Sequence, residues 1–168
     1  MMTQLPQNVS YASDNTMETP QYDIMVDVSE DNSYDIEETL MINFVTPHHG
    51  IYRYIPINGS EITNIRVPGY NYETYRENGN MVLKIGSGNY TLTGLNEYDI
   101  RYRITMYEDG NNEMDMLLLN LIPTGWETDI GSVKATVNLP KEADLSKVEI
   151  YSGTYGTEGN EDGAVANR

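Results

Sequence analysis

The sequence of 168 residues contains no cysteine, so the chain forms no disulfide, no thiolate metal site and no thiol nucleophile. It also lacks any apolar run of the roughly 18 or more residues that a membrane-spanning helix needs. Basic residues are scarce, because 10 Lys and Arg stand against 26 Asp and Glu, and the net charge is −16. A chain this acidic has no basic patch to hold phosphates, which excludes nucleic acid as a partner.

Both ends of the chain lack a hydrophobic pattern. Residues 1–20 are mostly polar, contain two prolines and show no apolar stretch typical of a signal peptide. Residues 153–168 are rich in glycine and small side chains. We therefore expect a flexible leader over 1–20, one β-sandwich domain over 21–152 and a flexible C-terminal tail over 153–168.

Hydrophobic and polar residues alternate through most of the expected domain. The pattern has a period of two in residues 22–28, 34–44, 81–85, 98–106 and 133–139. This period is typical of half-buried antiparallel strands. The polar residues 30–33 predict a turn, so the first two runs predict a hairpin. Residues 114–122 are apolar on both faces and predict the central, most buried strand.

Many short strands separated by turn residues predict an all-β fold, specifically an antiparallel Greek-key (immunoglobulin-like) β-sandwich. One local motif agrees with this expectation. Leu92, Gly94 and Tyr98 have the spacing of a tyrosine corner, in which the hydroxyl group of Tyr98 would bond to the backbone upstream. The alternative is a plain strand that follows a glycine turn.

Four segments in this order and spacing resemble the extracytoplasmic domain of bacterial predicted membrane proteins, domain of unknown function family 2207. The segments are residues 22–28, 49–56, 98–102 and 120–126, the last followed by 135–140. The resemblance covers about residues 21–158. It implies a β-domain outside the cytoplasm that downstream transmembrane helices anchor to the cell membrane in the full protein, and it implies no catalytic residues. We expect the chain to be a piece of that longer protein, whose pattern continues into further strands.

Candidate ligand sites are few. Asp109, Asn111, Glu113 and Asp115 recur at every second position around a glycine turn, and alternating oxygens of this kind can wrap Ca²⁺. The alternative is a solvated hairpin tip. His48 and His49 are adjacent, so on extended backbone they point to opposite faces, and we expect exposed turn histidines. Apart from possible calcium, we expect no cofactor and no catalytic residue.

Several other residues stand out from the pattern. Arg53 lies in an apolar strand, where an arginine pairs with a carboxylate or stacks on an aromatic ring. Trp126 and Asn120 flank a Pro-Thr-Gly turn, and we expect Trp126 in the core. Seven acids and no base occur between residues 23 and 38, which predicts that most of them share one solvated sheet face. Gly86-Ser87-Gly88 predicts a hairpin turn.

Two functions remain open from the sequence. The first is a non-enzymatic interaction or sensor domain of a membrane-anchored bacterial envelope protein, with an envelope protein or wall polymer as partner. The alternative is a carbohydrate-binding or carbohydrate-processing domain. Tyr70, Tyr72 and Tyr75 lie in a segment without apolar alternation, so we expect them in an exposed loop as a possible ligand platform.

Overall fold

The computed structural model describes residues 16–57, 59–107, 120–123, 126–142, 144, 146 and 149. Within these ranges the protein has no α-helix and contains eight strands. The strands are β1 (Met17–Val28), β2 (Ser33–His48), β3 (Gly50–Pro56), β4 (Ser60–Arg66), β5 (Tyr72–Glu77), β6 (Asn80–Gly86), β7 (Leu92–Met106) and β8 (Val133–Asn138).

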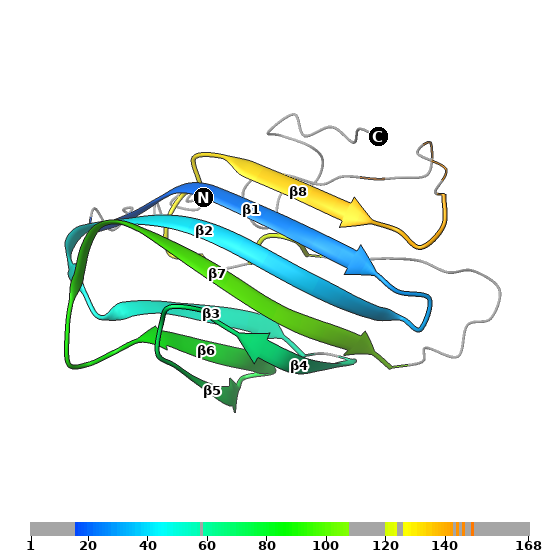
Figure 1. Cartoon of the computed structure of the whole chain (residues 1–168), viewed down its shortest axis with the longest axis horizontal. Helices are drawn as coiled ribbons and strands as arrows, with labels where there is room; N and C mark the ends of the chain where they lie inside the picture. Colours follow the sequence, from blue (N-terminus) through cyan, green and yellow to red (C-terminus); the bar gives the residue numbers. More distant parts are fainter. Residues whose placement is uncertain are drawn as a thin grey trace, which may run out of the picture.

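The strands form two sheets. The large sheet has the order β4-β7-β2-β1-β8, and the small sheet has the order β3-β6-β5. In Figure 1 the long strands β8, β1, β2 and β7 run side by side, and β3, β6 and β5 gather along one side of them. The all-β, two-sheet expectation is therefore confirmed, while the Greek-key, immunoglobulin-like arrangement stays a prediction.

The structure differs from the expectations in several places. Strand β8 pairs with β1 in parallel, so the large sheet is mixed, not purely antiparallel. Strand β1 begins at Met17, four residues before the expected start of the domain. Residues 86–88 join β6 to β7, which belong to different sheets, so they do not form a hairpin turn. Residues 120–122 of the expected central strand are not in a strand, and residues 114–119 lie outside the described part of the chain.

Alternation decides which side chains enter the core between the sheets. Leu40, Ile42 and Phe44 on β2 are buried, and Ile51 and Leu83 meet them from the small sheet in the same hydrophobic cluster. The polar residues between them point to solvent, as the period of two requires. Trp126, which follows Pro123, is half-buried and packs against this core, and its indole Nε1 donates to Thr19 Oγ1 at 2.9 Å.

One ion pair connects the two sheets inside this core. Glu38 occupies a core-facing position of β2 and Arg53 a core-facing position of β3, with side chains 0% and 3% exposed. Arg53 donates from Nε to Glu38 Oε2 at 2.8 Å and from Nη2 to Glu38 Oε1 at 2.7 Å. The hydroxyl of Tyr102 on β7 donates to Glu38 Oε1 at 2.5 Å. Glu38 therefore does not belong to the solvated acidic face, although it follows six acids between residues 23 and 37, none of which is buried.

The surroundings of Arg53 favour its charged form. Burial is the largest single influence and lowers the pKa of Arg53, but the charge and hydrogen bonds of Glu38, together with Tyr22 and Tyr102, raise the pKa well above the ordinary value. Arg53 Nη1 also donates to the backbone oxygen of Tyr54. The two-pronged geometry satisfies both carboxylate oxygens, which is the condition under which a buried pair offsets its desolvation.

Tyr98 does not form the expected tyrosine corner. It lies within β7, not at the start of the strand, and its ring stacks on Tyr70 with centroids 4.3 Å apart. Its hydroxyl is buried and has no hydrogen-bond partner among the described residues. Burial accordingly raises the pKa of Tyr98 well above the ordinary value. The side chain is a packing element of the core, with no bond back to the upstream backbone.

We predict that Arg53→Met lowers the free energy of unfolding by about 3–5 kcal/mol, because it leaves the Glu38 carboxylate buried without a cation. Arg103→Met is the matched control. Arg103 pairs with Asp35 at the half-exposed surface of the large sheet, and such pairs contribute about 0–1 kcal/mol. Urea denaturation of the three proteins tests this, and equal losses in both variants would contradict the bridging role of the buried pair.

We also predict that Tyr98→Phe leaves stability unchanged within about 0.5 kcal/mol or raises it, because the variant removes a buried hydroxyl that bonds to nothing described. Tyr102→Phe is the comparison. It removes a bond to the Glu38 carboxylate, and bonds to charged groups contribute about 1.5–3 kcal/mol. Thermal unfolding measures the stability of both variants. If both lose a similar amount of stability, the hydroxyl of Tyr98 has a hydrogen-bond partner after all.

Candidate functional site: the tyrosine face of the small sheet

The small sheet has one face in the core and one face in solvent. Its register places Tyr54 and Tyr75 on either side of Val82, and Tyr52 and Glu73 on either side of Lys84. These residues alternate with the core-facing residues of the same strands, so they share the outer face. We call this outer surface the tyrosine face, defined by Tyr52, Tyr54, Glu73, Tyr75, Val82 and Lys84.

Large aromatic rings are exposed on this face. Tyr52, Tyr54 and Tyr75 are 43%, 41% and 41% exposed. The rings of Tyr52 and Tyr54 lie with centroids 6.4 Å apart and planes 28° apart. Partial desolvation and the nearby carboxylate of Glu77 raise the pKa of Tyr75, so its hydroxyl remains a donor at neutral pH.

Val82 shows how this face is ordered. It is 0% exposed, yet it points away from the core between its core-facing neighbours Met81 and Leu83. Its cross-strand neighbours on this face are Tyr54 and Tyr75, so these two side chains are placed to cover it. The tyrosines therefore stand over a buried apolar side chain.

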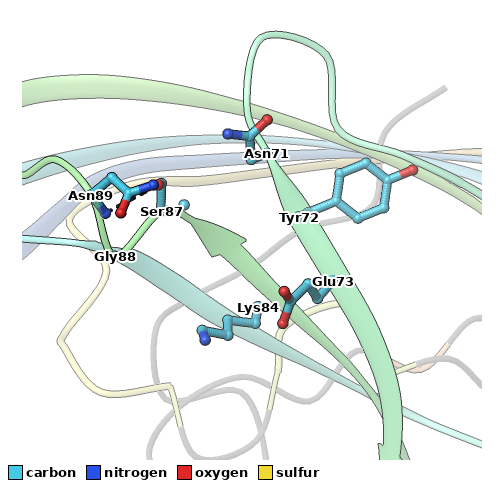
Figure 2. Close-up of a pocket in the computed structure, with 8 residues that line it drawn as sticks. Asn71, Tyr72, Glu73, Lys84, Ser87, Gly88 and Asn89 are labelled. Atoms are coloured by element: carbon cyan, nitrogen blue, oxygen red, sulfur yellow. Dashed lines mark hydrogen bonds between the residues drawn. The ribbon is translucent and has the colours of Figure 1, made fainter.

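A polar cavity adjoins the tyrosine face. Its volume is about 390 Å³, and its walls are the start of β5, the end of β6 and the loop after β6. Figure 2 shows Glu73 and Lys84 side by side on neighbouring strands, with Asn71 and the loop of Ser87 to Asn89 around them. Tyr72 projects away from this pair, because its hydroxyl is bound to the backbone oxygen of Ile65 at 2.9 Å.

A second hollow of about 210 Å³ lies on the β3 side of the tyrosine face. Tyr52 and Tyr54 form part of its wall, and Trp126, Glu127 and His48 contribute from other segments. The tyrosine face is therefore flanked by hollows on both sides. Aromatic surface combined with a few polar groups in a concave setting is the usual composition of a ligand site.

The cavity depends on an unusually close approach of backbone. Gly50 and Gly86 face each other across β3 and β6, with φ of 140° and 134°. A Cβ atom at Gly86 would lie 2.0 Å from the backbone oxygen of His49, and one at Gly50 would lie 1.8 Å from that of Ile85. Only glycine fits at either position, and this contact sets the path of the chain into the cavity loop.

Charge is distributed unevenly over the chain. Residues 49–92 contain four basic and three acidic residues, a net charge of +1, whereas the whole chain carries −16. The acidity is therefore concentrated outside the small sheet and its connections. On the large sheet Asp27 and Asp35 are cross-strand neighbours. Arg103 donates to Asp35 at 2.8 Å and holds the pKa of that carboxyl below its ordinary value.

The structure separates the three tyrosines that we expected in an exposed loop. Residues 72–77 form strand β5, because their backbone pairs along β6 in spite of the missing apolar alternation. Tyr70 packs inward against Tyr98, and the hydroxyl of Tyr72 is bound to the backbone oxygen of Ile65. Tyr75 alone of the three lies on the outer face.

The other candidate residues lie as follows. The possible calcium ligands Asp109, Asn111, Glu113 and Asp115 lie outside the described residues. In the ranges that the structure describes, no three His, Asp or Glu side chains gather as a metal site. His49 Nδ1 bonds to the backbone oxygens of Ser87 and Tyr90, and the His48 ring stacks on Phe44. Asn120 is exposed.

Sequence reasoning missed Tyr52 and Tyr54. Their signal was present, because they alternate with the buried Ile51, Arg53 and Ile55 along one strand. An arginine that must enter the core places its two tyrosine neighbours on the opposite face. The sequence gives no such signal that Tyr54 lies beside Val82 and near Tyr75, because these positions depend on the register of the strands.

The fold and this surface together define an all-β domain with an exposed aromatic face. The chain belongs to the family described as "Predicted membrane protein (DUF2207) N-terminal domain", whose profile matches residues 18–167. No curated protein sequence matches the chain significantly. Within the part of the chain that the structure describes, no helix is long and apolar enough to cross a membrane.

Solved structures give weak, partial matches. A mutant M1 zinc metallopeptidase from Deinococcus radiodurans bound to a Tyr-Ser-Ala substrate is 12% identical, with a TM-score of 0.38 over 61% of this chain and 23% of that chain. Yeast leukotriene A4 hydrolase in complex with bestatin is 12% identical, with a TM-score of 0.39 over 60% of this chain and 17% of that chain. The chain spans less than a quarter of these enzymes, and the likeness transfers no activity.

We predict that Gly86→Ala lowers the free energy of unfolding by about 1–3 kcal/mol, because the new Cβ meets backbone and the φ value is strained for other residues. Gly88→Ala is the control. Gly88 lines the same cavity, but a Cβ there has nothing within 4 Å. Chemical denaturation compares the two, and a harmless Gly86→Ala would mean that the close approach is not required.

Proposed function

We propose that this domain is a non-catalytic binding domain of a membrane protein, and that it contacts a component of the cell envelope on the extracytoplasmic side. The observation that supports this most directly is the tyrosine face. Three half-exposed tyrosines over a fully buried valine form an ordered apolar surface that the rest of the described fold leaves uncovered. Exposed aromatic surface of this kind marks a binding site in a soluble domain.

Membership of a predicted membrane protein family supports the location. The described part of the chain is a β-domain, and no helix in it could span a membrane. In our proposal, other parts of the full protein anchor this domain to the membrane, and the tyrosine face contacts the cell envelope. A sensor role fits the same arrangement, since occupancy of the face is then passed to the anchor.

We predict that the fluorescently labelled chain binds intact cells of the organism that produces it, and binds them as well as it binds lysed cells. Replacing Tyr52, Tyr54 and Tyr75 by serine together weakens this binding at least about tenfold, because aromatic residues at the centre of an interface contribute most of its affinity. Flow cytometry and sedimentation measure both quantities.

The control variant carries Tyr107→Ser and Leu95→Ser, which remove even more exposed apolar side chains elsewhere, at 62% and 61% exposure. It keeps wild-type binding. Binding that appears only after lysis would contradict the extracytoplasmic side. Equal binding by the tyrosine-face variant and the control would contradict this face as the contact surface.

A further inference from the structure

The polar cavity and the tyrosine face form one continuous surface. Lys84 lines the cavity and belongs to the tyrosine face, and so does Glu73. Val82, under the tyrosines, is two residues from Lys84 along β6, which is roughly 7 Å at the usual strand rise. A ligand of more than one ring can therefore contact both parts at once.

The two charged side chains of the cavity are not engaged with each other. In the part of the chain that the structure describes, neither Lys84 nor Glu73 forms an ion pair or a side-chain hydrogen bond, although they are cross-strand neighbours. Lysine offers three donors and an ionised glutamate only acceptors. With the amide side chains of Asn71 and Asn89 at the rim, the cavity suits hydroxyl groups, each of which both donates and accepts.

The aromatic part selects a flat, weakly polar partner. A pyranose ring presents C–H groups on its faces and hydroxyls around its edge, so it can rest on a tyrosine ring while its edge reaches polar groups. Tyr54 and Tyr75 lie two strand spacings apart across Val82, roughly 10 Å, so they can hold successive parts of an extended chain.

The charge of the chain further restricts the kinds of ligand that can bind. A polyanion is repelled by a chain of net charge −16. A basic partner is drawn to the acidic large sheet, whereas the small sheet and its connections carry a balance of only +1. An uncharged polymer suits this balance, because Lys84 and Glu73 already match each other in charge.

Resting on the proposed function, we infer that the tyrosine face and its cavity bind an uncharged polysaccharide of β-1,4-linked pyranoses. Such a chain is a flat ribbon with equatorial substituents and can lie along the outer face of a sheet. The site binds the chain without cutting it. Glu73 and Glu77, two acidic residues of this outer face, are four residues apart on β5, about 13 Å along the backbone. In glycoside hydrolases the two catalytic carboxyl groups lie at most about 9.5 Å apart.

Isothermal titration calorimetry of the full 168-residue chain with cellohexaose and chitohexaose tests the inference. At least one hexaose binds, and Tyr54→Ala or Tyr75→Ala weakens its binding by at least about tenfold. Tyr107→Ala, a control far along the chain from this face, has no effect. Because Tyr54 and Tyr75 cover Val82, Lys84→Gln and Glu73→Gln provide variants outside that packing, and each weakens binding about three- to tenfold.

Polymers with the same backbone isolate the charge argument. Affinity gel electrophoresis retards the chain in hydroxyethyl cellulose and does so much less in anionic carboxymethyl cellulose. Absence of binding to both hexaoses, or binding that all four site variants retain, overturns the inference. A different outcome separates this inference from the proposed function. If neither hexaose binds, but the variant with Tyr52, Tyr54 and Tyr75 replaced by serine still binds cells more weakly, the polysaccharide inference is wrong. The proposed function then stands, with a protein as the partner.

Discussion

The ion pair between Glu38 and Arg53 is the contact on which the arrangement of the two sheets depends. It joins β2 of the large sheet to β3 of the small sheet with both charges removed from solvent. A buried charge without its partner costs several kcal/mol, so alternative packings of the small sheet that separate the two are strongly disfavoured. The pair therefore favours the observed placement of the small sheet.

The same pair determines what the small sheet presents to solvent. Side chains alternate along a strand, so an inward Arg53 requires Tyr52 and Tyr54 to point outward. The antiparallel register then places Val82 and Tyr75 beside Tyr54, and Lys84 and Glu73 beside Tyr52. A structural interaction in the core and a candidate binding surface are thus two faces of one short strand.

The two sheets also differ in charge, and this divides their roles. The outer side of the large sheet carries carboxylates opposite one another, such as Asp27 and Asp35, and only partial compensation by arginine. Such a surface keeps the domain apart from other acidic molecules. The small sheet is close to neutral and aromatic, and it is therefore the surface that we propose for an uncharged partner.

The sequence by itself determined most of the strands, because a period of two is typical of half-buried β-structure, but it missed β5, which lacks that alternation. It also indicated the family and the need of Arg53 for a partner. Tertiary structure decided the rest. Glu38 looked like one more acid of a solvated run, and only packing against β3 shows it as the partner. Tyr98 has the spacing of a tyrosine corner, but it lies in the middle of β7 and its hydroxyl has no hydrogen-bond partner among the described residues. The tyrosine face unites residues 52 to 84 through strand register, which depends on contacts between segments far apart in the chain.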